Sequence, residues 1–307
     1  ALWAPSYGQE AAQVGSARAA RDQDSIFPAY REHAVALIRG VDPVDIVRMM
    51  RGLTHGGWDP AAHGNFRPYT LVIGSQTLHA TGYAMGIQFD GATATGNPET
   101  DEAVMVYFGD GATAQGDTNE ALVFAASYAT PQVFFLQNNH WAISVPVERQ
   151  SRVPLYRRAS GFGMPGVQVD GNDVLATFAV TGALLDDARA GRGPALIEAL
   201  TYRIGAHTTA DDPTKYRSAD ELAEWTARDP ILRLRRHLEG LGVDAAVFQR
   251  IDAEAADLAA DLRRRIITLE NPPTSLMFDH VYSEPHPDTV AQQAWLTDYE
   301  ASYGESS

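Results

Sequence analysis

One stretch of the sequence, residues 104–145, constrains the fold more than any other. An apolar run rich in β-branched and aromatic residues, 104–108, breaks at Gly109-Asp110-Gly111, and a second apolar run, 133–136, ends at Asn138-Asn139. The residues between the runs have helical periodicity, so the stretch predicts a strand–helix–strand unit. The strands of such a unit are parallel, and their carboxyl ends meet at the sheet edge where open α/β sheets bind ligands. We therefore expect Asp110 and Asn139 to face one site.

The polar residues at these strand ends suit a diphosphate bridged by Mg²⁺. Mg²⁺ prefers oxygen ligands and takes only one or two carboxylates, while N–H groups at the helix start, near Gly116 or Asp117, suit an anion. The glycines beside Asp110 let the backbone approach a ligand closely. A lone Gly-Asp-Gly is usually only a polar turn. Here 26 residues separate Gly111 from Asn138, and this spacing between two apolar strands resembles the signature of thiamine-diphosphate enzymes.

Composition excludes several other classes of protein. A chain of 307 residues that is 45% hydrophobic buries a large core, as one domain or as one domain with a helical appendage. A net charge of −15 and a pI near 4.9 disfavour nucleic acid and anionic membrane surfaces as partners. Cysteine is absent, which excludes disulfides, thiolate catalysis and cysteine-bound zinc and fits a cytoplasmic protein. No apolar run reaches the length of a membrane span.

The flanking sequence predicts further helices and a second strand–helix–strand unit. Asp42 followed by Pro43 marks a helix start, with Asp42 as the N-cap. The second unit brings the carboxyl end of another strand, and with it His207, to the same edge. Because the chain begins within a helical pattern, we expect a segment before it. Helices are expected from residue 8, over 44–53, 75–89 and 174–190, and from residue 220, and strands over 167–169 and 195–202.

Several other features have a structural interpretation that we favour. The match to G-x-G-x-x-G at 161–166 precedes a strand instead of following one, so it predicts a turn and not a dinucleotide site. An arginine beside a tyrosine, as at Tyr30-Arg31, is usually a surface pair. His55 and His63 lack a third ligand at a diagnostic spacing, which favours loop packing over metal binding. Solvated arginines are expected at Arg149, Arg152, Arg157 and Arg158, and sheet-facing residues at Leu122, Ala125, Ala126 and Ala129.

Nearly the whole chain resembles the alpha subunit of the thiamine-diphosphate-dependent, decarboxylating component of 2-oxo acid dehydrogenase complexes. Seven segments occur in the family's order: Gly8-Gln9-Glu10-Ala11, Tyr30-Arg31-Glu32, Ile73-Gly74-Ser75-Gln76, 109–117, 138–146, Val169-Asp170-Gly171-Asn172-Asp173 and 201–217. The resemblance implies the α/β thiamine-diphosphate-binding fold, a mainly parallel sheet with helices on both faces. It also implies that residues 1–240 bind the diphosphate half of the cofactor and that residues 241–307 form a C-terminal helical extension packed on them.

The resemblance also implies roles for individual residues. Mg²⁺ would be bound by Asp110, Asn139 and the Trp141 carbonyl. The diphosphate would lie against Arg31 and a catalytic His207, flanked by Tyr30. The polar segment 206–218 that contains His207 is expected to close over the diphosphate. The other expected cofactor contacts are Ile73, whose backbone meets the aminopyrimidine, Ile143, which holds thiamine in its bent form, and Gly109, Gly111 and Ala112 around the diphosphate.

The active site of a thiamine enzyme has one part that binds the diphosphate of the cofactor and another that binds its pyrimidine. The resemblance implies that this chain holds only the diphosphate part. The resemblance implies that a beta subunit supplies the missing half, with the glutamate that activates thiamine, in an α₂β₂ heterotetramer. Such a component decarboxylates a 2-oxo acid and passes the acyl unit to the lipoyl domain of an acyltransferase component.

Different segments of the sequence resemble enzymes with different substrates. Tyr30-Arg31-Glu32, 141–144 and 202–205 resemble branched-chain enzymes, which we favour, whereas 73–76 and His33 resemble pyruvate enzymes. An acetoin-type dehydrogenase is a third alternative. Two alternatives come from other classes of protein. The intact Asp110, Asn139 and His207 disfavour a non-catalytic regulatory or scaffold relative, and the misplaced glycine pattern disfavours a nicotinamide oxidoreductase.

Overall fold

A computed structural model describes residues 2–54 and 57–303 of the chain. Its main strands are β1 (Ser25–Phe27), β2 (Val104–Gly109), β3 (Gln132–Asn138), β6 (Gly166–Asp170) and β7 (Ala195–Leu200), and its short strands are β4 (Trp141–Ala142) and β5 (Val145–Pro146). Its helices are α1 (Glu10–Ala19), α2 (His33–Ile38), α3 (Pro43–Met50), α4 (Ser75–Phe89), α5 (Gly116–Tyr128), α6 (Val147–Gln150), α7 (Arg158–Gly161), α8 (Val174–Asp187), α9 (Ala219–Thr226), α10 (Pro230–Gly240), α11 (Ala245–Ile267) and α12 (Pro287–Ala301).

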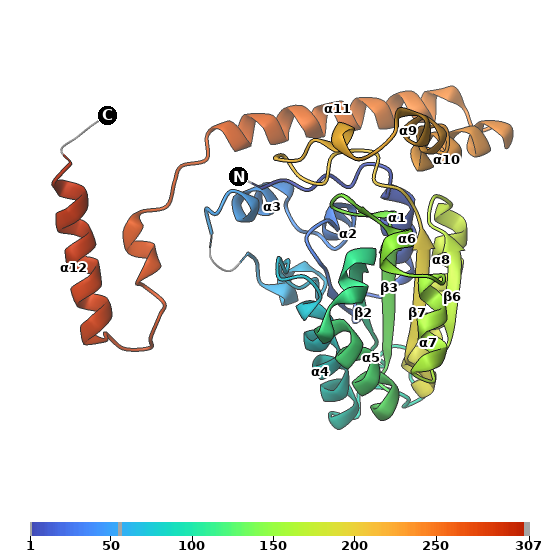
Figure 1. The fold of residues 1–307 in the computed structure, drawn as a ribbon, viewed down its shortest axis with the longest axis horizontal. Helices are drawn as coiled ribbons and strands as arrows, with labels where there is room; N and C mark the ends of the chain where they lie inside the picture. The colour runs from blue at the N-terminus through green and yellow to red at the C-terminus, as the bar shows by residue number, and fades with distance from the viewer. Residues whose placement is uncertain (1, 55–56, 304–307) are drawn as a thin grey trace. The chain divides into compact units, whose positions relative to one another are not determined.

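The five main strands form one parallel sheet in the order β1-β2-β3-β7-β6, and the last four lie side by side in Figure 1. The predicted unit is β2-α5-β3, and the register pairs Gly109 with Gln137. Asp110 and Asn139 therefore follow neighbouring strand ends, and the predicted α/β class is confirmed. The second predicted unit is β6-α8-β7, whose register pairs Asp170 with Leu200.

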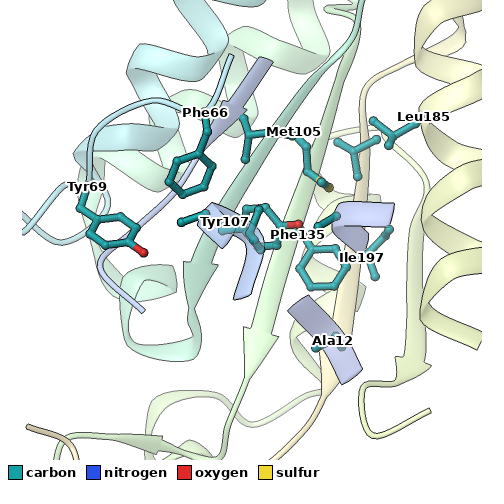
Figure 2. Close-up of a cluster of buried hydrophobic side chains, with 14 of the residues drawn as sticks. Ala12, Phe66, Tyr69, Met105, Tyr107, Phe135, Leu185 and Ile197 are labelled. Carbon is teal, nitrogen blue, oxygen red and sulfur yellow. The ribbon is translucent and has the colours of Figure 1, made fainter. Parts of the chain in front are cut away.

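Alternate residues of the central strands face two separate layers of helices. Met105, Tyr107 and Phe135 belong to one buried cluster, which also contains residues of α1, α2, α3 and α8. Figure 2 shows these side chains with Ala12 of α1 and Leu185 of α8. Residues of β2 and β3 that alternate with them pack against α4, α5 and α7 in the second cluster. Because both faces are covered, β2 and β3 are apolar over most of their length, and the polar residues of β3 lie at its two ends. The strand β7 differs, because it carries the buried Glu198 in its middle.

Local helix signals hold well, with one error. Asp42 caps α3 by accepting from the Val44 N–H at 2.9 Å, with Pro43 in the first turn as predicted. Leu122 and Ala125 of α5 are buried as predicted. The prediction for Ala129 is wrong: it is exposed at the C-cap of α5 with a φ of 49°. Its place in the apolar spacing was misleading because the helix ends one residue earlier.

The contacts divide the chain into two compact units, Ala1–Ile266 and Ile267–Ser307. The first unit contains the sheet, its helices and nearly all of α11. The second contains α12, on which Trp295 stacks with Tyr299 at a ring separation of 5.2 Å. The domain boundary expected at residue 240 stays a prediction. No helix in the described part of the chain is long and apolar enough to cross a membrane.

The glycine pattern at 161–166 serves packing. It forms the end of α7, a turn and the first residue of β6, as predicted. A Cβ on Gly166 would lie 2.2 Å from the Tyr156 carbonyl oxygen and 2.8 Å from the Ala159 Cβ. A Cβ on Gly161 would meet nothing within 4 Å. Only Gly166 is therefore required by close contact.

We predict that Gly166→Ala lowers the free energy of unfolding by about 1–3 kcal/mol, because Gly166 is fixed in β6 and the added methyl group collides with the Tyr156 carbonyl. Gly161→Ala is the matched control and should stay within about 0.5 kcal/mol of the parent. Urea unfolding of the three proteins measures both values. Equal stability of the two variants would contradict the packing role of Gly166.

Candidate active site

A cavity of about 240 Å³ opens at the carboxyl ends of β2 and β3. All the residues to which the sequence assigned cofactor or metal roles line it: Tyr30, Arg31, Ile73, Gly109, Asp110, Gly111, Ala112, Asn139, Trp141, Ile143 and His207. They come from five separate stretches of the chain, so the fold brings together what the sequence could only place at strand ends. Their binding roles stay predictions.

Asp110 is a buried carboxylate without an ion pair among the residues that the structure describes. It is 1% exposed and accepts a hydrogen bond from Gln150 Nε2 at 2.7 Å. Burial raises the pKa of this carboxyl group, and the hydrogen bond from Gln150 lowers it by a smaller amount. A cation at Asp110 would remove the cost of burying its charge. Gly111 directly after it must be small, because a Cβ there would lie 2.8 Å from the Ala142 Cβ.

Asn139 and the Trp141 carbonyl offer further oxygen atoms beside Asp110. The Asn139 amide is fixed on both sides, since its Nδ2 donates to Gln9 Oε1 at 3.2 Å and its Oδ1 accepts from the Trp141 N–H at 3.2 Å. The Trp141 carbonyl accepts from Arg203 Nη1 at 3.0 Å and keeps one lone pair. No group of three His, Cys, Asp or Glu side chains suited to a metal occurs in residues 2–54 and 57–303. A metal here would therefore depend on one carboxylate with amide and carbonyl oxygens, which is chemistry that Mg²⁺ accepts.

Arg31 corrects the sequence-based interpretation, because it is not a surface residue. It is 6% exposed, and Nη1 donates to the Pro5 carbonyl at 2.7 Å while Nη2 donates to the His207 carbonyl at 3.1 Å. Burial lowers the pKa of its guanidinium group. Its carbonyl partners carry no net charge, and no ion pair of Arg31 occurs in the described structure. An anion in the cavity would supply the missing negative charge.

Arg203 lies beneath the site and was not predicted to be part of it. Its guanidinium is 0% exposed and donates to the Trp141 carbonyl, to the Ile143 carbonyl at 2.7 Å and to the Tyr216 hydroxyl at 2.8 Å. It thereby joins the segment after β7 to the loop after β3. The available signal was a charged residue just after a buried strand, at the same edge as His207.

His207 is held as a neutral imidazole. Its Nδ1 lies 3.2 Å from both Arg31 Nη2 and Arg203 Nη1, and because both guanidinium groups can only donate, Nδ1 accepts and Nε2 carries the proton. Burial first, and then the charges of Arg31 and Arg203, lower the pKa of His207 to about 4. At neutral pH this residue is therefore a hydrogen-bond donor through Nε2–H and not a titrating acid.

Ile143 carries backbone strain at the mouth of the cavity. It joins β4 to β5 with a φ of 54°, a conformation that β-branched residues avoid and at a hairpin position that usually has glycine. Such strain costs on the order of 1–3 kcal/mol and persists where surrounding contacts hold it. Arg203, which binds the Ile143 carbonyl, is such a contact. With this backbone conformation, the bulky Ile143 side chain forms part of the cavity lining.

Polar groups without partners gather around this cavity. Gln9 Nε2, Gln76 Oε1 and Gln137 Oε1 belong to lining residues, are buried, and have no hydrogen-bond partner in the described structure. Arg203 Nε and Gln150 Oε1 nearby are in the same state. Buried polar atoms normally have partners, so their concentration here indicates a polar ligand. An unpaired carboxylate, unpaired guanidinium groups and these amides fit a magnesium diphosphate.

The sequence also predicted four solvated arginines, and one of these predictions is wrong. Arg158 is only partly exposed and donates to the Thr113 carbonyl at 2.7 Å, which ties α7 to the turn after Asp110. The interpretation of His63 as a packing residue agrees with its contact to the Gly40 carbonyl at 2.9 Å. His55 lies outside the described residues.

The fold and the site together define an α/β protein with a polar cavity at the carboxyl edge of a parallel sheet. The model of the dehydrogenase E1 component family matches residues 1–261. The chain belongs to this family, as the alpha subunit of a 2-oxo acid dehydrogenase.

Two relatives of this chain are named for different 2-oxo acids. The 3-methyl-2-oxobutanoate dehydrogenase subunit alpha of Mycobacterium tuberculosis (strain ATCC 25618 / H37Rv) is 45% identical over 298 residues, 96% of this chain and 79% of the relative. The pyruvate dehydrogenase E1 component subunit alpha of Staphylococcus aureus (strain N315) is 37% identical over 296 residues, 95% of this chain and 77% of the relative.

We predict that His207 titrates with a pKa of about 4 in the cofactor-free protein. Because this pKa lies below the ordinary value of 6.5, the unfolded chain binds the proton more readily, and the contribution of His207 to stability falls as the pH is lowered from about 6.5 to about 4. NMR of the imidazole C–H signals measures the pKa, with His207→Gln to assign them. Arg203→Met should raise it, and Arg228→Met, just beyond the end of α9, should not. A pKa of 6.5 in the parent protein would contradict this electrostatic account.

Proposed function

We propose that this chain binds the diphosphate of thiamine diphosphate through Mg²⁺ and acts in the oxidative decarboxylation of a branched-chain 2-oxo acid. One observation carries the proposal: Asp110 and Arg31, both buried and both without an ion pair among the described residues, line the same cavity. Each charge is costly alone, and a magnesium diphosphate satisfies both. Membership of the dehydrogenase E1 component family supports the same cofactor.

The residues of this chain would divide the work in a simple way. Asp110, Asn139 and the Trp141 carbonyl would hold Mg²⁺, and Arg31 would hold the diphosphate. Gly109, Gly111 and Ala112 let the backbone pass close to it, and Tyr30 flanks it, with its ring 6.2 Å from that of His207. When bound, thiamine diphosphate supplies a thiazolium that accepts the electron pair released as CO₂ leaves the 2-oxo acid.

His207 would act as a fixed hydrogen-bond donor and catalytic residue. With Nδ1 occupied by two guanidinium groups, only Nε2–H is available to a phosphate oxygen or to an oxygen of the reacting acid. Donors held in place before the reaction stabilise developing negative charge without reorganisation. Ile143 would press on the thiamine from the mouth of the cavity, and the backbone at Ile73 would meet the aminopyrimidine.

The preference for a branched-chain substrate rests on relatives. The alpha subunit named for 3-methyl-2-oxobutanoate shares more of this sequence than the one named for pyruvate does, at 45% against 37% identity over nearly the same length. Pyruvate is the second candidate, and an acetoin-type substrate the third.

A beta subunit would complete the active site. Leu71, Val72 and Ile73, beside the cavity, expose 54%, 70% and 40% of their surface, which suits burial by another subunit. The exposed side of α4 and α5 also carries aromatic residues, Tyr83, Phe89, Phe124 and Tyr128. We propose an α₂β₂ heterotetramer that delivers the acyl unit to the lipoyl domain of an acyltransferase component. Its location in the cytoplasm stays a prediction.

We predict that Asp110→Asn, assembled with the beta subunit, loses saturable thiamine-diphosphate binding, because the neutral amide cannot bridge Mg²⁺ to the diphosphate. Asp117→Asn is the matched control: this aspartate lies in the first turn of α5, is exposed, and does not line the cavity. Calorimetry should show parent-like binding for the control and none for Asp110→Asn or for the parent in EDTA. Undiminished affinity of Asp110→Asn would exclude the metal site.

We predict that the purified chain alone decarboxylates no 2-oxo acid, and that adding its beta subunit produces turnover with an artificial electron acceptor. With a panel of acids, kcat/KM should be highest for branched-chain substrates. A higher value for pyruvate would shift the assignment to the second candidate. No turnover of any acid by the assembled protein would support a scaffold role.

We predict that Gly82→Leu on α4 impairs assembly. A Cβ on Gly82 or Gly86 meets nothing within 4 Å in this chain, so the two glycines leave an open surface for close approach of another subunit. Gly240→Leu, at a position on α10 that is equally open, is the control. Size-exclusion chromatography with the beta subunit should show dissociation only for Gly82→Leu. Intact assembly of that variant would remove α4 from the interface.

A further inference from the structure

Glu32 and Gln137 form a buried pair in the lining of the active-site cavity, and no role has been assigned to either. Glu32 follows Arg31 directly and is 1% exposed, and Gln137 lies near the end of β3 and is 2% exposed. Both line the cavity that holds Asp110 and Arg31. A buried carboxylate beside an anion site needs an explanation, because its charge would repel the ligand.

The contact between them has an unusual geometry. Gln137 Nε2 lies 2.5 Å from Glu32 Oε1, while Glu32 Oε2 accepts from the Arg31 N–H at 3.2 Å. Hydrogen bonds of the N–H···O type usually span roughly 2.7–3.2 Å, whereas O–H···O bonds span roughly 2.5–3.0 Å. The other amide atom, Gln137 Oε1, is buried and has no partner in the described structure.

The same short contact also accommodates a second orientation of the Gln137 amide, reached by a half-turn. This orientation places Oε1 against Glu32, where a protonated Glu32 can donate to it at an O–H···O distance. It also places Nε2, a donor, where the unpartnered acceptor Oε1 now lies. In that orientation every polar atom of the pair is satisfied once an anion occupies the cavity, and the repelling charge is gone.

We propose that Glu32 and Gln137 are a proton-coupled positioning pair, in which binding of the diphosphate turns the Gln137 amide toward the anion while Glu32 takes up one proton from solvent. The proton bonds to Glu32 and is donated to Gln137 Oε1, and no other bond changes. This inference rests on the proposed function, since it concerns the same diphosphate site.

The surroundings of Glu32 support this coupling. Burial raises the pKa of its carboxyl group, and the N–H and charge of Arg31 oppose that rise by smaller amounts. Within the described part of the chain, the Tyr30, Tyr69 and Tyr107 hydroxyls also interact with its charge. An anion in the cavity raises the pKa of Glu32 further. The bound state therefore holds more protons, and affinity for the anion falls as pH rises through the pKa of Glu32 in the free protein.

Calorimetry of the assembled α–β protein with inorganic pyrophosphate and Mg²⁺ tests the proposal. Titrations in buffers of different ionisation enthalpy give the number of protons taken up per site. Protons exchanged by pyrophosphate and by Asp110 are common to all variants, so differences between variants isolate Glu32. We expect Glu32→Gln to take up about one proton fewer than the parent when pyrophosphate binds. Its pyrophosphate affinity should also fall less steeply as pH rises, by up to about tenfold per pH unit.

Glu198→Gln is the matched control. Glu198 on β7 is also 1% exposed and accepts from Asn138 Nδ2 at 2.7 Å, but it does not line the cavity. Its proton count should equal that of the parent. Gln137→Leu retains Glu32 and removes the amide, so it should weaken pyrophosphate binding and also lose the extra proton. This second variant keeps the test decisive if Glu32→Gln fails to fold.

The outcomes separate the two claims. If the parent binds pyrophosphate but Glu32→Gln or Gln137→Leu takes up as many protons as the parent does, the coupling is overturned and the proposed function stands. If the parent with Mg²⁺ does not bind pyrophosphate or thiamine diphosphate, the proposed function fails and the coupling fails with it. A parent-like count for Glu198→Gln, with one proton fewer for both other variants, supports the pair.

Discussion

The parallel pairing of β2 with β3 is the constraint on which the rest of the site depends. Its register sets Gly109 beside Gln137, so the turn that contains Asp110 and the loop that contains Asn139 must leave the sheet at the same place. Helices cover both faces of these strands, and at the carboxyl edge Asp110 and Arg31 are only 1% and 6% exposed. Charges at that edge consequently interact strongly and are costly when unpaired.

A ligand that neutralises these buried charges binds more tightly, because it removes the cost of leaving them unpaired. Asp110 on one side, and Arg31 and Arg203 on the other, are buried without ion pairs in the part of the chain that the structure describes. They are not paired with each other in the described structure: the guanidinium groups donate to carbonyl groups and to the imidazole of His207, and Asp110 accepts from Gln150. A ligand with both a divalent cation and an anion is complementary to this separated pair of charges. The same two guanidinium groups fix the tautomer of His207, so the anion site also sets which atom of His207 can donate.

Features that depend on neighbouring residues were predictable from the sequence. Strand periodicity, the glycines beside Asp110 and the cap at Asp42 are of this kind, and they predicted β2, β3, β6, β7 and α3 with ends that differ by a few residues. The short strand β1 was not predicted, because three residues are too few to show a period. Arg31 was misjudged because its partners, Pro5 and His207, are 26 and 176 residues away. The contact of Glu32 with Gln137 spans 105 residues, and no local signal indicates it. The resemblance to a family supplied the roles of Arg31 and His207, which the residues alone did not.

We infer that the cavity binds a cation and an anion together. The cation neutralises the buried charge of Asp110, and the anion neutralises the buried charges of Arg31 and Arg203. Thermal unfolding of the assembled protein with Mg²⁺ alone, pyrophosphate alone and both together measures this coupling, since a ligand that binds the folded state raises the unfolding midpoint. The account predicts that the shift with both ligands exceeds the sum of the separate shifts. Additive shifts, or a full shift with pyrophosphate in EDTA, would contradict it.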